Sequence, residues 1–292
     1  MRRFSQVDVF TDTPFRGNPL AVVLDAEGLS TEQMQRFTAW TNLSEAAFVL
    51  PPSTADADYR VRIFTAVREL PFAGHPTLGT CHAWLAAGGR PRAESVVVQE
   101  CGAGLVPIAR DGGRLAFTAP AEAHRGPLPG PLRAHVAGVL GIGEPEILDA
   151  GWASNGQSWC MVLLPSARRV LELRPTRAGA EAERAAGYPA QVRPGYIGVA
   201  GPHPPGAPAD FEVRAFFPAG AGFAEDPVTG GLNALMATWL RGAGRVPGSG
   251  YRVSQGTALG RAGRLWIDFA PDGAARVGGS CVGCVSGVVD FE

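Results

Sequence analysis

The chain of 292 residues contains no lysine, and all 26 of its basic residues are arginine. Without lysine, neither a substrate nor pyridoxal phosphate can be held as a Schiff base, and a phosphate loop of the G-x-x-x-x-G-K type is excluded. A G-x-G-x-x-G sequence between a strand pattern and a helix pattern is also missing, which argues against a Rossmann dinucleotide site. These absences exclude lysine-dependent chemistry and the commonest nucleotide sites.

Long apolar runs and clusters of one charge are scarce as well. No stretch approaches the roughly 18 apolar residues of a membrane span, and no apolar targeting segment follows Met1. With a formal net charge of −1 and no basic run longer than Arg2-Arg3 or Arg168-Arg169, nothing indicates a surface for nucleic acid. We therefore expect a cytoplasmic protein that binds neither membrane nor nucleic acid.

The five cysteines form no pattern typical of a disulfide framework. Cys281 and Cys284 have C-x-x-C spacing, but they fall in a strand pattern, where residues three apart point to opposite faces. We interpret Cys81, inside a predicted helix, as a small buried apolar residue. The sequence gives no reason to expect a metal site.

What the chain does contain is an apparent duplication. The segment from Phe72 to Ala86 aligns without a gap with the segment from Phe223 to Ala237, with identity at six of fifteen positions. Upstream, Val61-Arg62-Ile63-Phe64 recurs as Val213-Arg214-Ala215-Phe216. Each copy reads as a strand, a turn rich in glycine and proline, and then a helix.

Each copy is predicted to form a helix start that can bind an anion. The proline just inside each helix leaves unpaired amides, and the helix dipole favours negative charge there. The alignment puts His75 before one proline and Asp226 before the other. If the two halves face each other, the two starts line one cleft, in which free amides at Gly74, His75, Gly230 and Gly231 hold a substrate carboxylate. As an alternative, Asp226 and His75 could simply cap their helices.

The remaining elements suggest two domains and a third ionisable residue. A helix is predicted from Ser30 to Trp40, followed by Glu45 directly before an apolar strand, where burial would make its carboxylate a usable base. A strand pattern at 159–165 faintly resembles the segment 42–51, and a charged helix is predicted around 178–186. We assign residues 1–120 and about 278–292 to one domain and residues 131–277 to the other, with a linker at 121–130 rich in proline, glycine and alanine.

Six short stretches, in the same order along the chain, resemble the PhzF family of phenazine-biosynthesis-like isomerases. They are Val7-Asp8-Val9-Phe10, Gly17-Asn18-Pro19-Leu20-Ala21-Val22, Asn42-Leu43-Ser44-Glu45, Glu69 to Thr77, Glu225-Asp226-Pro227-Val228-Thr229-Gly230 and Gln255-Gly256. The resemblance implies the α/β (α+β) fold of diaminopimelate epimerase: two pseudo-symmetric domains, each a curved mixed sheet wrapped around a central helix.

The same resemblance implies a cofactor-independent isomerase. It makes Glu45 the acid/base that moves a proton between two carbons of a small carboxylated substrate, with His75 and Asp226 assisting. It places Asn18, Ser44, Gly74, Gly230 and Gly231 on motifs that line the substrate. A homodimer is a further expectation from the family.

The chain departs from the family pattern at Gly231, where the family usually has serine. Loss of one neutral hydrogen bond, worth about 0.5–1.5 kcal/mol, should retune substrate choice rather than abolish activity. Related racemases carry a cysteine at each helix start, whereas Gly74 and Gly231 stand there in this chain, so two-thiol racemisation is not expected. A one-base epimerase or dehydratase and a non-catalytic binding protein remain alternative interpretations.

Overall fold

The computed structural model describes residues 1–119, 122–155, 157–176, 195–220, 222–246 and 249–291. The chain divides into two compact units, one of residues 1–118 and 276–292 and the other of residues 119–275. The helix that we predicted around 178–186 lies outside the described residues. Each unit is described by itself below.

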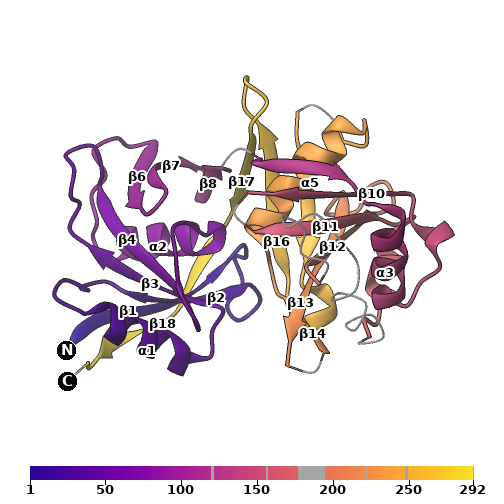
Figure 1. Cartoon of the computed structure of the whole chain (residues 1–292). Helices are drawn as coiled ribbons and strands as arrows, with labels where there is room; N and C mark the ends of the chain where they lie inside the picture. The colour runs from indigo at the N-terminus through magenta and orange to yellow at the C-terminus, as the bar shows by residue number, and fades with distance from the viewer. Residues whose placement is uncertain (120–121, 156, 177–194, 221, 247–248, 292) are drawn as a thin grey trace. The chain divides into compact units, whose positions relative to one another are not determined.

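The first unit contains two helices and a mixed sheet (Figure 1). Its elements are β1 (Arg2–Val9), β2 (Asn18–Val23), α1 (Thr31–Thr41), β3 (Glu45–Leu50), β4 (Tyr59–Thr65), β5 (Glu69–Leu70), α2 (Gly74–Ala86), β6 (Val96–Cys101), β7 (Gly104–Asp111), β8 (Arg114–Thr118), β17 (Ala275–Gly279) and β18 (Cys281–Val289). The strands pair in the order β18-β1-β2-β3-β4-β6-β7-β8-β17, with β5 added to β4 as a hairpin.

The sheet of the first unit wraps around α2, as the fold class predicted. This helix packs against β1, β2, β3, β6, β8 and β18, and Gly74 to Cys81 are all buried. Gly79 makes the approach possible, because a Cβ there would lie 2.7 Å from Leu20 Cδ2 and 2.8 Å from Val9 Cγ2. The predicted cap of α1 is also present, with Ser30 and Gln33 forming a reciprocal capping box.

The apolar run of β3 follows from its position between the two helices. Residues 46–50 are all buried, because α2 covers one face of the strand and α1 packs against β3 and β4 from the other. Phe37 of α1 packs edge-to-face on Phe48 of β3, which in turn packs on Phe64 of β4. The core therefore fixes the start of β3, where Glu45 stands.

The second unit repeats this plan. Its elements are β9 (His124–Pro127), α3 (Gly130–Leu140), the 3-10 turn η1 (Glu144–Glu146), β10 (Asp149–Ser154), β11 (Ser158–Leu163), α4 (Ala167–Glu172), β12 (Ile197–Pro202), β13 (Phe211–Ala219), β14 (Gly222–Asp226), α5 (Gly230–Gly242), β15 (Tyr251–Gln255), the 3-10 turn η4 (Thr257–Leu259) and β16 (Gly263–Phe269). Residues 124–127, which we placed in a linker, instead form β9 and pair with β10.

The pairing order shows that the duplication is real. From β1 to β7 the successive pairs are antiparallel, parallel, antiparallel, parallel and antiparallel, and the series from β10 to β16 is the same. The hairpin strand β5 corresponds to β14, and helix α2 corresponds to α5. By this order β11 matches β2, so our comparison of segment 159–165 with segment 42–51 was wrong, and β12 is the counterpart of β3.

The gap-free alignment of the two copies was also wrong in register. Both central helices are 13 residues long and start at Gly74 and Gly230. The alignment matched Gly230 with Gly79, five residues too late. Pro76 is the third residue of α2, whereas Pro227 lies before the N-cap of α5, Thr229.

Two matching ion pairs give the correct register. Arg62 binds Glu69 through two hydrogen bonds of 2.7 Å, and Arg214 binds Glu225 through hydrogen bonds of 3.1 and 2.7 Å. Each glutamate pairs across its hairpin with a phenylalanine, and the arginine of the pair stacks over that ring. In this register Leu70 matches Asp226 and His75 matches Gly231, so the expected exchange of histidine for aspartate does not occur.

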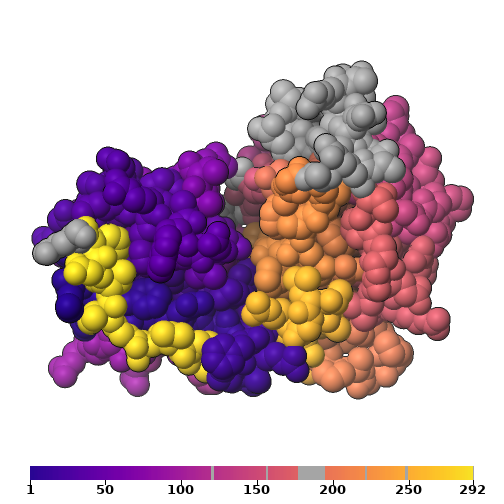
Figure 2. All heavy atoms as spheres, turned by 90° about the horizontal axis from the view of Figure 1, so that it is seen from below, coloured from indigo at the N-terminus to yellow at the C-terminus, as the bar shows by residue number. Residues whose placement is uncertain are grey.

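The last strand returns to the first unit, where β18 pairs antiparallel with β1. Figure 2 shows these C-terminal residues in yellow on the surface beside indigo residues of the N-terminal strands. Val285 and Val288 of β18 are 49% and 62% exposed. None of the described helices is long and apolar enough to cross a membrane.

Candidate active site

Glu45 lies at an edge of the first unit where two parallel strands begin. Strands β2 and β3 pair in parallel with Ala21 opposite Ala46, so Asn18 and Glu45 stand at the same end of the sheet. Asn18 is 1% exposed, and the Glu45 side chain is 18% exposed. Ser44 precedes the strand and is exposed. The topology thus gathers three of the predicted residues at one edge.

His75, the second residue of α2, meets Glu45 at this edge. Its Nδ1 lies 3.5 Å from Glu45 Oε2, and its side chain is only 7% exposed. Burial lowers the pKa of His75 to about 3, although a hydrogen bond with the Pro19 backbone acts in the opposite direction. The imidazole is therefore neutral at neutral pH, and its contact with Glu45 is a polar contact rather than an ion pair.

The neutral ring of His75 has a defined tautomer. The backbone of Pro19 offers only a carbonyl oxygen, so the histidine ring must be the donor in their hydrogen bond. Nε2 is buried and has no hydrogen-bond partner within the described part of the chain, which leaves Nδ1 as the nitrogen that carries the proton. The second nitrogen, Nε2, therefore keeps a lone pair that can accept a hydrogen bond.

The start of α2 presents backbone amides beside this pair. Its N-cap, Ala73, has no side chain that could cap the helix, and the first amide bonded within the helix belongs to Thr77. The amides of Gly74 and His75 precede that bond, and the helix dipole favours an anion in front of them. A carboxylate, a neutral imidazole and the first amides of a helix are thus adjacent in one unit.

In the second unit, Asp226 occupies a different kind of position. It is the last residue of β14, paired with Ala215 of β13, and it accepts a hydrogen bond of 2.6 Å from the Thr229 hydroxyl at Oδ2. Thr229 is the N-cap of α5, but its side chain does not cap the helix. The alternative of Asp226 as a cap is therefore wrong. Helix α5 begins with Gly230 and Gly231 and not at Pro227, which we expected just inside the helix.

Gly231 has room for a side chain. Among the described residues, a Cβ placed there would have one neighbour within 4 Å, Asn155 Oδ1 at 3.9 Å. The Asn155 amide donates from Nδ2 to the Gly231 carbonyl at 3.2 Å. The family serine could therefore be accommodated without strain, and Asn155 borders the space that its hydroxyl would occupy.

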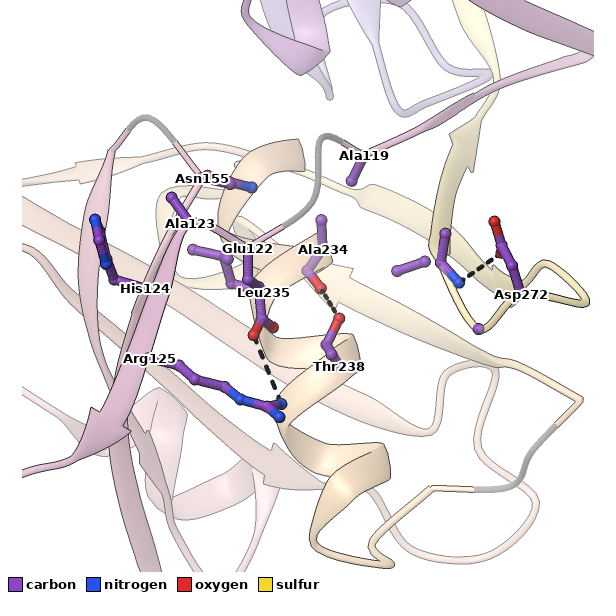
Figure 3. A pocket seen from close by; sticks show the side chains of 13 residues that line it. Ala119, Glu122, Ala123, His124, Arg125, Asn155, Ala234, Leu235, Thr238 and Asp272 are labelled. Carbon is purple, nitrogen blue, oxygen red and sulfur yellow. Dashed lines mark hydrogen bonds and ion pairs between the residues drawn. The ribbon is translucent and has the colours of Figure 1, made fainter.

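Asn155 also lines a pocket of the second unit with a volume of about 550 Å³ (Figure 3). The pocket runs beside α5 and is lined by Ala119, Glu122, Ala123, His124, Arg125, Asn155, Ala234, Leu235, Thr238 and residues 272–275. Figure 3 shows Arg125 reaching toward Glu122, and their charged atoms lie 3.7 Å apart. None of Glu45, His75 and Asp226 lines this pocket.

Sequence reasoning did not identify three residues around α5 that the structure implicates. Asn155, Thr229 and Gln255 contact the start of α5 or Asp226, yet Asn155 lies 76 residues from its partner Gly231. The motif Gln255-Gly256 was a signal, but no role could be assigned to it from the sequence. No group of three or more His, Cys, Asp or Glu residues that could hold a metal ion occurs in the described ranges.

Comparison with known proteins decides the family. The family model PhzC-PhzF, described as phenazine biosynthesis-like protein, matches residues 7–287. The chain belongs to this family. A curated relative, trans-2,3-dihydro-3-hydroxyanthranilate isomerase of Pseudomonas aeruginosa, is 33% identical over 91% of this chain and 90% of its own length. Antisense-enhancing sequence 1 of Schizosaccharomyces pombe is 34% identical over 97% of both chains.

Solved structures confirm the fold. A PhzF-family protein of Bacillus anthracis superposes with a TM-score of 0.81 at 23% identity, over 99% of both chains. A probable proline racemase of Agrobacterium radiobacter has a TM-score of 0.62 at 14% identity, over all of this chain and 94% of the other. The expectations of the PhzF family and of the diaminopimelate epimerase-like fold are therefore confirmed, and the family supports isomerase activity.

Proposed function

We propose that this PhzF-family protein shifts a proton within a small unsaturated carboxylic acid, with Glu45 as general acid/base. The observation that carries the proposal is the position of Glu45: a largely buried carboxylate 3.5 Å from a neutral histidine, at the start of a helix with open amides. A base that takes a proton from one carbon and returns it to another needs no cofactor. General acid/base catalysis by one positioned group contributes about 10²–10⁴-fold.

The neighbours of Glu45 give it a consistent environment for that role. Because His75 is neutral, its ring places no positive charge beside the Glu45 carboxylate, and such a charge would weaken that carboxylate as a base. The first amides of α2 can hold the carboxylate of the substrate and so orient the carbon acid. We assign substrate contacts to Asn18, Ser44 and Gly74 in this unit.

The second unit contributes, in the same proposal, Asp226 as an assisting polar group and Gly230 and Gly231 as substrate contacts. The thiols contribute nothing to the chemistry, since burial raises the pKa of Cys81 to about 12 and no cysteine stands at the start of either central helix. The proposal names an isomerase without cofactor. A homodimer remains a prediction from the family, and a cytoplasmic location remains a prediction from the sequence.

Incubation in heavy water tests the function. The isomerase named for the Pseudomonas aeruginosa relative suggests trans-2,3-dihydro-3-hydroxyanthranilate and similar small acids as trial substrates. Proton NMR should show solvent deuterium entering a carbon position together with movement of the double bond. Deuterium uptake with inversion of a stereocentre would instead indicate an epimerase, and binding without exchange of any carbon-bound proton would contradict an enzymatic role.

A further inference from the structure

The side chain of Gln255 has a single possible orientation. It is fully buried, its Oε1 accepts from the Thr229 backbone amide at 3.1 Å, and its Nε2 donates to the Asp226 carbonyl at 3.2 Å. A backbone amide can only donate and a carbonyl can only accept, so exchanging the two ends of the Gln255 amide would break both bonds. Asn233 Nδ2 supports the same orientation, donating to Gln255 Oε1 at 2.8 Å.

This orientation fixes the direction of the Thr229 hydroxyl. Gln255 Nε2 also donates to Thr229 Oγ1 at 3.0 Å, so that oxygen acts as an acceptor toward the glutamine. The one proton of the hydroxyl is then directed to Asp226 Oδ2, at 2.6 Å. A hydroxyl that must donate, over a distance typical of a bond to a charged oxygen, favours the ionised form of the carboxyl group.

We propose that Thr229, oriented by Gln255, is a positioning residue that keeps Asp226 an ionised hydrogen-bond acceptor during the reaction. This inference rests on the proposed function for the catalytic consequence, but its structural part can be tested without activity. It assigns the two units different chemistry: Glu45 changes its protonation state during the reaction, while Asp226 remains a carboxylate throughout.

The first unit provides an internal comparison. There Gln99, also fully buried, donates from Nε2 to Thr77 Oγ1 of α2 at 3.0 Å and accepts from the Tyr59 hydroxyl at 3.0 Å. The two glutamines lie at different register positions, since Gln99 pairs with Tyr59 and Gln255 pairs with Val213. A buried glutamine that donates to a threonine hydroxyl at the central helix is nevertheless common to both repeats. A carboxylate at the end of the hairpin strand is not, because Leu70 stands where Asp226 stands in the second unit. The hydrogen bond from a threonine hydroxyl to a carboxylate is thus found in the second unit and not at the equivalent place in the first.

The variants Thr229→Val and Thr229→Ser, with Thr77→Val as the matched control, test the proposal. Carbon-13 NMR of carboxyl-labelled protein should show Asp226 titrating about one pH unit higher in Thr229→Val and near the parent value in Thr229→Ser. The acid limb of the kcat/KM profile should move by the same amount, which is a tenfold loss of activity at a pH on that limb. Thr77→Val should shift neither the NMR titration of Asp226 nor the acid limb of the kcat/KM profile.

An unchanged Asp226 titration in a folded Thr229→Val protein would overturn the inference. So would a Thr229→Ser protein that titrates like Thr229→Val, because serine restores the hydroxyl. Should the parent protein show no isomerase activity, the proposed function fails, while the NMR titration still decides whether Thr229 keeps Asp226 ionised. The two failures are therefore distinguishable.

Discussion

The two matching ion pairs predict that the same substitution has very different costs in the two units. In the second unit, the side chains of Arg214 and Glu225 are each 6% exposed. Their counterparts Arg62 and Glu69 are 27% and 39% exposed. Breaking a buried pair by removing one partner costs about 3–5 kcal/mol, whereas an exposed pair contributes about 0–1 kcal/mol.

We expect Glu225→Ala to cost about 3 kcal/mol of unfolding free energy, at the lower end of the range for a buried pair. In this variant Arg214 Nη1 still donates hydrogen bonds to the carbonyls of Val170 and Leu173, at 3.1 and 2.9 Å. Amide hydrogen exchange followed by mass spectrometry measures the opening free energy of each unit separately. Exchange in peptides covering 211–240 should accelerate about hundredfold in Glu225→Ala. Peptides covering 59–86 should accelerate less than tenfold in Glu69→Ala. Equal acceleration in the two variants would refute the reasoning.

Three further predictions concern His75, Gly79 and Gly231. The pKa of His75 falls from 6.5 to about 3 on folding, so below pH 6.5 the unfolded chain binds a proton that the folded chain does not. The free energy of unfolding should therefore fall by about 3 kcal/mol between pH 6.5 and roughly pH 4. Urea denaturation of His75→Gln over the same pH range should show a smaller loss. Gly79→Ala should lower the free energy of unfolding by about 1–3 kcal/mol, because it forces a Cβ against side chains of β1 and β2. Gly138→Ala should raise the free energy of unfolding by up to about 1 kcal/mol, because this helix position is exposed and has open space around it. Gly231→Ser should leave the urea midpoint unchanged and alter kcat/KM between trial acids by about tenfold or less; a large loss of stability would contradict the open space seen beside Asn155.

The duplication could be predicted from the sequence, but its register could not. Local patterns identified the strand, turn and helix of each repeat unit and the recurring Val-Arg dipeptide, but they did not identify β9, which we placed in the linker. The gap-free match rested on alanine, glycine and proline, which recur by chance in helix starts. The correct register depends on the pairing of Glu69 and Glu225 with their arginines across a hairpin, and a single sequence does not show how long each hairpin loop is.

The sequence predicted those candidate residues whose positions follow from the neighbouring strand or helix pattern. Glu45 directly precedes a buried strand, and His75 lies in the first turn of a helix, so both positions could be inferred from pattern and resemblance. The direction of the Thr229 hydroxyl could not, since it is set by Gln255, 26 residues farther along the chain. Hydrogen-bond direction depends on which partners burial leaves available, and only the structure shows this.

The central claim is that Glu45 carries the proton. Its most direct test is the rate of solvent-deuterium incorporation into a bound substrate by Glu45→Gln, compared with Glu32→Gln, the same change at an exposed glutamate of α1. Glu45→Gln should still bind the acid in a calorimetric titration but lose at least a hundredfold in exchange rate, while Glu32→Gln keeps the parent rate. Exchange by Glu45→Gln at the parent rate would contradict the account.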